Sequence, residues 1–156
     1  MRKFLPFIII GAVLLIGYSY FKGINNTAVT LDQNVKESWG NVETSYQRRN
    51  DLIGNLVKTV QGAAEYEKGT LTAVIEARAK ATSVTIDPSN VTPEQLAQFQ
   101  QAQGGMTSAL SRLLVTVEQY PSLKANENFL KLQDELASTE NQILTARTRF
   151  NESIEK

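Results

Sequence analysis

Apolar residues recur at helical spacing along much of the chain. The first run steps by three or four residues with one gap of seven, and it shows no sustained alternation of apolar and polar positions. Its members are Leu31, Val35, Trp39, Val42, Tyr46, Ile53, Leu56, Val60 and Ala63. This spacing places a single apolar stripe along a helix. The stripe continues to about Ala81, which predicts one long helical stretch.

A connection and a second helix follow. The segment SVTIDPSNVTPEQ contains two prolines and several turn-forming residues, so it interrupts the helical pattern. It ends in Thr92-Pro93-Glu94-Gln95, which has the residue types of an N-cap, a proline at the first helical position and a capping-box Gln. The following stripe runs from Leu96 to Val117. The pair Gly104-Gly105 lies inside it and leaves open whether there are one or two helices.

The last stripe runs from Phe129 to Ile154. Helices with one apolar face and short connections bury those faces by packing antiparallel. We therefore expect an all-α body, an antiparallel bundle of three long helices, or of four if the glycine pair divides one of them.

The chain begins with a different pattern. Phe4 to Phe21 contains 18 residues without a formal charge, and Arg2, Lys3 and Lys22 flank it. A helix of this length spans about 27 Å, close to the hydrocarbon thickness of a bilayer. Tyr18 and Tyr20 stand where aromatic residues meet a membrane interface. We expect a transmembrane anchor over residues 1–22 and a helical bundle domain over 23–156.

A cleaved signal peptide is the alternative interpretation of this segment. The stretch is long for a signal peptide and lacks a clear small-x-small cleavage site, which favours an uncleaved, single-pass anchor. Two basic residues before the stretch against one after it favour a cytoplasmic N-terminus. The body is then expected outside the inner membrane, on the periplasmic side.

Composition removes several classes of function. The chain has no His and no Cys, and 16 basic residues balance 16 acidic ones. Imidazole or thiolate metal sites and Ser-His or Cys-His nucleophile pairs are therefore absent. Nucleic-acid binding, which calls for surplus positive charge, is disfavoured. We expect neither a cofactor nor a metal, and no enzymatic activity.

Charged residues on the apolar stripes are the remaining candidate site. Arg49 fills the gap of seven, and Glu140 and Arg147 share one face of the last helix. A core-facing Arg needs a partner, because an unpaired buried charge is costly. Glu140 is the expected partner, with Asp51 and Glu118 completing a structural polar network. A catalytic carboxylate cluster is the less favoured interpretation, because neighbouring Arg residues hold carboxyl groups ionised.

Several blocks resemble the LemA family of bacterial membrane proteins. They include QRRNDLIGNLV, EKGTLTAVIEAR, EQYPSLKANENFLKLQDEL and TENQILTARTRFNESI, and the resemblance covers nearly the whole chain. Family members commonly have Pro in place of Gly54, and they usually continue beyond the RFNES block, an extension that this sequence lacks. The resemblance implies a single-pass membrane protein with a helical-bundle body and no established catalytic residues.

Two functions fit these features. The first is a membrane-anchored scaffold or interaction protein that assembles with itself or with other membrane and envelope proteins. The alternative is a binding module that holds a peptide or an amphipathic ligand in a groove between helices.

Overall fold

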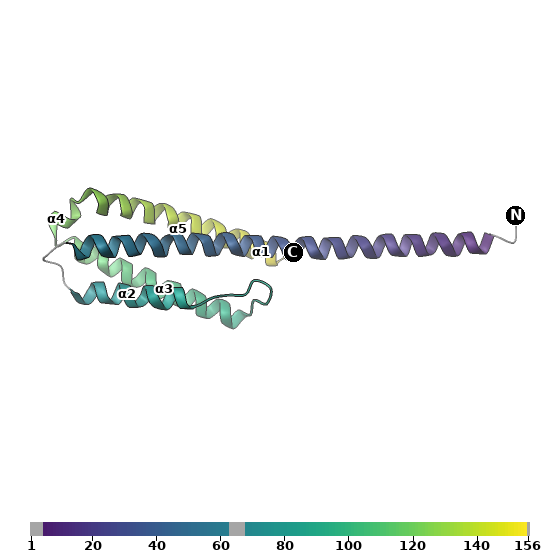
Figure 1. The fold of residues 1–156 in the computed structure, drawn as a ribbon, viewed down its shortest axis with the longest axis horizontal. Coiled ribbons are helices and arrows are strands. Elements are labelled where there is room, and N and C mark those ends of the chain that lie inside the picture. Colours follow the sequence, from purple (N-terminus) through teal and green to yellow (C-terminus); the bar gives the residue numbers. More distant parts are fainter. Residues whose placement is uncertain (1–4, 63–67, 156) are drawn as a thin grey trace.

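The computed structural model describes residues 5–62 and 68–155, with side chains from residue 11 onward. These residues form helices and contain no strand, so the prediction of an all-α bundle is confirmed. Figure 1 shows one helix much longer than the others and a bundle gathered around one half of it.

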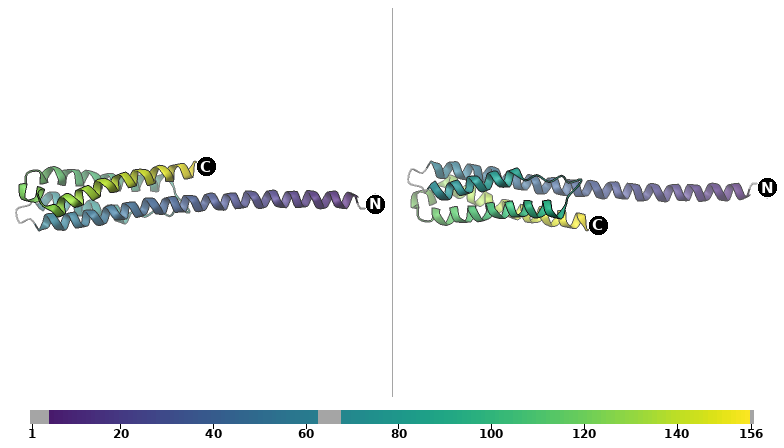
Figure 2. Two further views of the ribbon diagram at one scale, coloured as in Figure 1. Left: turned by 90° about the horizontal axis from the view of Figure 1, so that it is seen from above. Right: turned by 90° about the horizontal axis from the view of Figure 1, so that it is seen from below.

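The long helix, α1 (Leu5–Gln61), has 57 residues and extends over about 85 Å. Its N-terminal half projects beyond the bundle, and the C-terminal end of the chain lies beside its middle (Figures 1 and 2). The expected division between residues 22 and 23 falls inside this continuous helix. Along the projecting part, the large apolar side chains from Val13 to Phe21 are exposed.

The predicted anchor lies partly outside the described residues. Arg2, Lys3 and Phe4 belong to the segment that is not described, as do the side chains of residues 5–10. Within the part that is described, no helix has a stretch long and apolar enough to cross a membrane.

The prediction of one helix from Leu31 to about Ala81 is wrong. α1 ends at Gln61, and α2 (Lys68–Ser83) runs back antiparallel to α1 (Figure 1). The apolar spacing continues from one helix to the next because both helices bury residues in the same core, among them Val60 and Val74. A single straight helix could not turn both sets of side chains toward one interior.

The predicted start of the next helix is confirmed. α3 (Pro93–Val117) has Thr92 as its N-cap. The Gln95 backbone N–H donates to Thr92 Oγ1 at 3.2 Å, and the Thr92 N–H donates to Gln95 Oε1 at 3.2 Å. This reciprocal pair is a capping box, which satisfies two amides that the first helical turn leaves unpaired.

Gly104 and Gly105 do not divide α3. Both lie on its exposed face, where an added Cβ would meet nothing within 4 Å. The flanking turns bury Phe99 and Met106. Core packing on either side thus outweighs the helix penalty of about 1 kcal/mol for each glycine. A short helix, α4 (Pro121–Lys124), then leads into α5 (Glu127–Ile154).

The four long helices bury two separate groups of side chains. α5 packs along α1, and α3 packs along α2 (Figure 2). The aromatic cluster lies nearer the projecting end of α1 and contains Trp39, Val42, Tyr46, Ile86, Phe99, Ile143, Ala146 and Phe150. The larger aliphatic cluster lies nearer α4 and includes Ile53, Leu56, Val60, Val74, Met106, Leu113, Val117 and Leu136. The fold therefore has two apolar layers, with polar residues between them.

Candidate functional site

Arg49 is the charged residue at the centre of the bundle. It lies on α1 between Tyr46 of the aromatic cluster and Ile53 of the aliphatic cluster, and it is 2% exposed. Its Nη1 atom lies 3.1 Å from Glu140 Oε1 on α5 and donates to it. Nη1 also donates to Thr107 Oγ1 on α3 at 3.3 Å. The ion pair therefore joins α1 to α5.

Gln103 extends this network to the other pair of helices. The Arg49 Nη2 group donates to Gln103 Oε1, and Gln103 Nε2 donates to the backbone oxygen of Ala81 at 3.3 Å. Ala81 lies on α2, so the polar layer has members on all four long helices. Gln103 is 4% exposed, and its role in the network was not predicted from the sequence. Its position on the apolar stripe of α3, between Phe99 and Met106, was the available signal.

The two charges of the ion pair lie in different surroundings. The Arg49 side chain is 3% exposed, whereas the Glu140 side chain is 43% exposed. Water therefore screens the carboxylate, which reduces the contribution of the pair to stability. The guanidinium has little access to water, and its Nε has no hydrogen-bond partner. Removing its counter-charge would leave an unpaired cation in the core, which is more costly than leaving an unpaired cation at the surface.

Tyr46 lies against this buried guanidinium. The Arg49 Cζ atom is 4.9 Å from the centre of the Tyr46 ring, within cation–π range. Burial raises the pKa of the Tyr46 hydroxyl. The positive charges of Arg147 and Arg49 act in the opposite direction, and the Arg147 side chain also acts as a hydrogen-bond donor to Tyr46. The phenol is therefore neutral at physiological pH and packs as part of the aromatic cluster.

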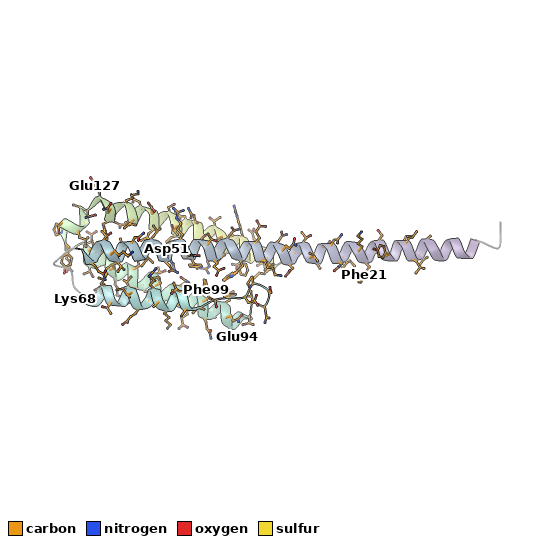
Figure 3. All side chains as sticks on the ribbon, viewed as in Figure 1. Phe21, Asp51, Lys68, Glu94, Phe99 and Glu127 are labelled. Carbon is orange, nitrogen blue, oxygen red and sulfur yellow. The ribbon has the colours of Figure 1, made fainter. Side chains whose placement is uncertain are left out.

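Two predicted members lie away from the network. Glu118 follows the end of α3, is exposed, and pairs with Lys124 of α4. Asp51 lies on an exposed face of α1 (Figure 3) and makes no ion pair with any described residue. Asp51 is only two positions after Arg49, and residues two apart point to different sides of a helix. Asp51 therefore lies on a different side of α1 from the buried Arg49.

Three of the predicted interface residues, Tyr18, Tyr20 and Lys22, belong to the projecting half of α1. Tyr18 is 67% exposed and Tyr20 is 73% exposed, and Lys22 is also exposed. Arg2 and Lys3 lie outside the described residues.

The composition of the polar layer suits a structural role. Its single carboxylate, that of Glu140, is already paired with the Arg49 guanidinium. In the part of the chain that the structure describes, no group of three or more acidic side chains could hold a metal ion. What the layer can do is pair helices in one register, because a shift along any of them would leave Arg49 or Gln103 unpaired.

The Glu140→Gln variant tests this structural role. Loss of the carboxylate charge leaves the buried Arg49 guanidinium without a counter-ion. We expect the free energy of unfolding to fall by about 1 kcal/mol, since Glu140 is partly solvated. Urea unfolding followed by circular dichroism measures the change. Glu76→Gln removes a charge from an exposed position on α2 and is the matched control. Unchanged stability in Glu140→Gln would contradict the role.

Comparison with known proteins identifies the family. The LemA family profile matches residues 38–156, from just before Trp39 to the last residue. A LemA protein of Metamycoplasma hominis is 24% identical over 147 residues, which cover 93% of this chain and 64% of that protein.

Magnetosome proteins are also similar. MamQ 2 of Paramagnetospirillum magneticum is 28% identical over 143 residues, covering 81% of this chain and 53% of that protein. MamQ of Magnetospirillum gryphiswaldense is 28% identical over 145 residues, which cover 82% of this chain and 53% of that protein. The chain thus spans about half the length of these MamQ relatives. Since the family profile covers residues 38–156, which include Trp39 of the aromatic cluster, the polar layer and α5, the chain belongs to the LemA family.

Proposed function

We propose that this protein is a non-enzymatic, membrane-anchored helical bundle that acts as a scaffold or interaction protein. The observation that carries the proposal is the continuity of α1. One helix supplies both the core-forming residues of the bundle and an uncovered apolar segment that extends away from it.

The uncovered segment has a surface suited to lipid. Val13, Leu14, Leu15 and Ile16 are consecutive and 61–71% exposed, so apolar side chains face every side of the helix. A helix that is apolar all round belongs in a protein core or in a membrane. The flanking charges and the aromatic residues Tyr18 and Tyr20 fit the ends of a membrane span.

The helix would also hold the bundle at a set distance. The residues from Lys22 to Thr30 are exposed and continue α1 toward Trp39, the first fully buried residue of the bundle. From Lys22 to Trp39 the helical rise is about 25 Å. This geometry suits a protein that presents its helices to partners near a membrane surface.

The relatives support such a role in general terms. Proteins named for the magnetosome share the matched region, and neither MamQ nor LemA carries the name of an enzyme. Assembly with copies of itself or with other envelope proteins is part of the proposal, and the body is proposed to lie on the periplasmic side.

If residues 1–22 anchor the protein, charged residues at positions 13 and 14 should strongly reduce its retention in the membrane. We expect the unaltered chain to stay in the membrane fraction during alkaline carbonate extraction. A Val13→Lys, Leu14→Lys double variant should be released, because each Lys near the middle of a span costs about 2.5–3.5 kcal/mol. The control is Ile24→Lys with Val29→Lys, which adds the same charge to exposed positions beyond the predicted span. Release of the unaltered chain would refute the anchor.

Sidedness can be measured with a single thiol. The chain has no Cys, and Ser89 is exposed in the connection between α2 and α3, so Ser89→Cys creates one accessible thiol. We expect a membrane-impermeant maleimide to label this thiol in intact spheroplasts, where the outer face of the inner membrane is accessible. Labelling only after the membrane is permeabilised would place the bundle in the cytoplasm.

The interaction role predicts species larger than the monomer. A membrane-permeant lysine cross-linker applied to cells should join the anchored protein to another copy or to other proteins, because the anchor concentrates them in one plane. Immunoblotting detects the adducts. The Val13→Lys, Leu14→Lys variant at equal abundance is the control and should lose them. A protein that remains monomeric and uncross-linked in its membrane would contradict the proposal.

A further inference from the structure

Arg78 lies beside an open groove between α1 and α2. It projects from α2, and its Nε donates to the backbone oxygen of Asn50 on α1 at 2.9 Å. The guanidinium lies over Gly54, where an added Cβ would be 3.3 Å from Arg78 Cζ. The hydrogen bond holds the Arg78 guanidinium against α1, and the lack of a side chain at Gly54 leaves room for it.

This guanidinium has no acidic partner. Among the residues that the structure describes, Arg78 makes no ion pair, although Asp51 lines the same groove. A guanidinium offers several N–H donors in a plane, and Arg78 uses one of them on Asn50. Its terminal nitrogens are therefore free to bind an anion.

The groove contains other features of a binding site. Its first cavity has a volume of about 420 Å³ and is lined by Arg78, Lys58, Val57 and Ile75, among others. Lys58 is exposed and unpaired within the described residues, and it supplies a second positive charge. Ile75 is 43% exposed and supplies an apolar wall. Two cations beside an apolar wall suit a carboxylate next to an apolar side chain.

A second cavity of about 290 Å³ continues the groove and shares Arg78 and Asp51 with the first. Asn50 lines it and is 6% exposed, and its Oδ1 atom has no hydrogen-bond partner. A buried acceptor without a donor is costly, and a ligand N–H is one way to satisfy it. A peptide provides such N–H groups as well as side-chain carboxylates.

We propose that this groove binds an acidic peptide segment of a partner protein. An Asp or Glu carboxylate of the segment pairs with Arg78 and Lys58, its apolar neighbour packs on Ile75, and a backbone N–H faces Asn50. Asp51 lines both cavities and Glu43 lines the second, and their negative charges favour binding of the peptide carboxylate at the Lys58 end of the groove. The proposal rests on the interaction role and supplies the chemistry of its partner.

Isothermal titration of the full chain in neutral detergent micelles tests the proposal. The probes are an acetylated, amidated pentapeptide with one Glu between two Leu residues and its Gln counterpart. We expect the Glu peptide to bind at least about tenfold more tightly, since charge-assisted hydrogen bonds exceed neutral ones. Equal binding of the two peptides would overturn the proposal. Inorganic phosphate is the third probe, and binding of phosphate as tight as that of the Glu peptide would assign the groove to small anions instead.

Three variants locate the binding. Arg78→Gln should abolish the preference for Glu, Lys58→Gln should weaken it several-fold, and Gly54→Ala should weaken it by displacing the guanidinium without changing charge. Arg112→Gln on the exposed face of α3 is the matched control and should bind normally. Circular dichroism melting checks each fold. If Arg78→Gln unfolds, Lys58→Gln and Gly54→Ala decide the outcome, and an unchanged preference in both would refute the site.

Cross-linking in cells separates this inference from the proposed function. One outcome is that adducts form with the unaltered chain and persist in a folded Arg78→Gln variant. This outcome would leave the interaction role standing and refute the groove as its basis. If Arg78→Gln unfolds, persistence of the adducts in Lys58→Gln and Gly54→Ala has the same meaning. Absence of adducts with the unaltered chain would count against both.

Discussion

The need to compensate one buried guanidinium constrains how the four long helices fit together. Arg49 lies between two apolar clusters and binds Glu140 of α5 and Gln103 of α3, and Gln103 in turn binds a backbone oxygen of α2. Apolar contacts tolerate a shift of one helix along another, because one methyl group can replace another. Hydrogen bonds at one level of the bundle do not tolerate such a shift, so the polar layer selects one register.

The same layer lies next to the proposed binding groove. Asn50 follows Arg49 in the chain, and its backbone oxygen accepts the hydrogen bond that positions Arg78. A helix held in register by Arg49 therefore also sets where the Arg78 guanidinium lies relative to Lys58 and Ile75. Core and groove are linked through two consecutive residues of α1, which places an interaction surface on a rigid element rather than on a loop.

The length of α1 connects the bundle to the proposed membrane anchor. The helix runs without interruption from Leu5 to Gln61, and α5 packs along its C-terminal half. In the proposed function, the core contacts of Trp39 and Tyr46 stabilise the helix that also carries the exposed segment Val13–Ile16. An orientation imposed on that segment by lipid would be transmitted to the bundle, because no hinge separates them in the described helix.

Sequence alone was enough to predict the helical class, the inward faces of the helices and the capping box at Thr92, because these depend on spacing and on interactions within a few residues. The spacing of the apolar residues also predicted that Arg49 and Glu140 lie on the core-facing sides of their helices. The packed fold was needed to show that the chain reverses after Gln61, that α3 continues through Gly104, and that Gln103 completes the polar layer. It also separated Asp51 and Glu118 from that layer and placed Arg78 over Gly54. Local periodicity specifies which side of a helix is buried, whereas the choice of neighbouring helix and its register depends on contacts between residues far apart in the chain.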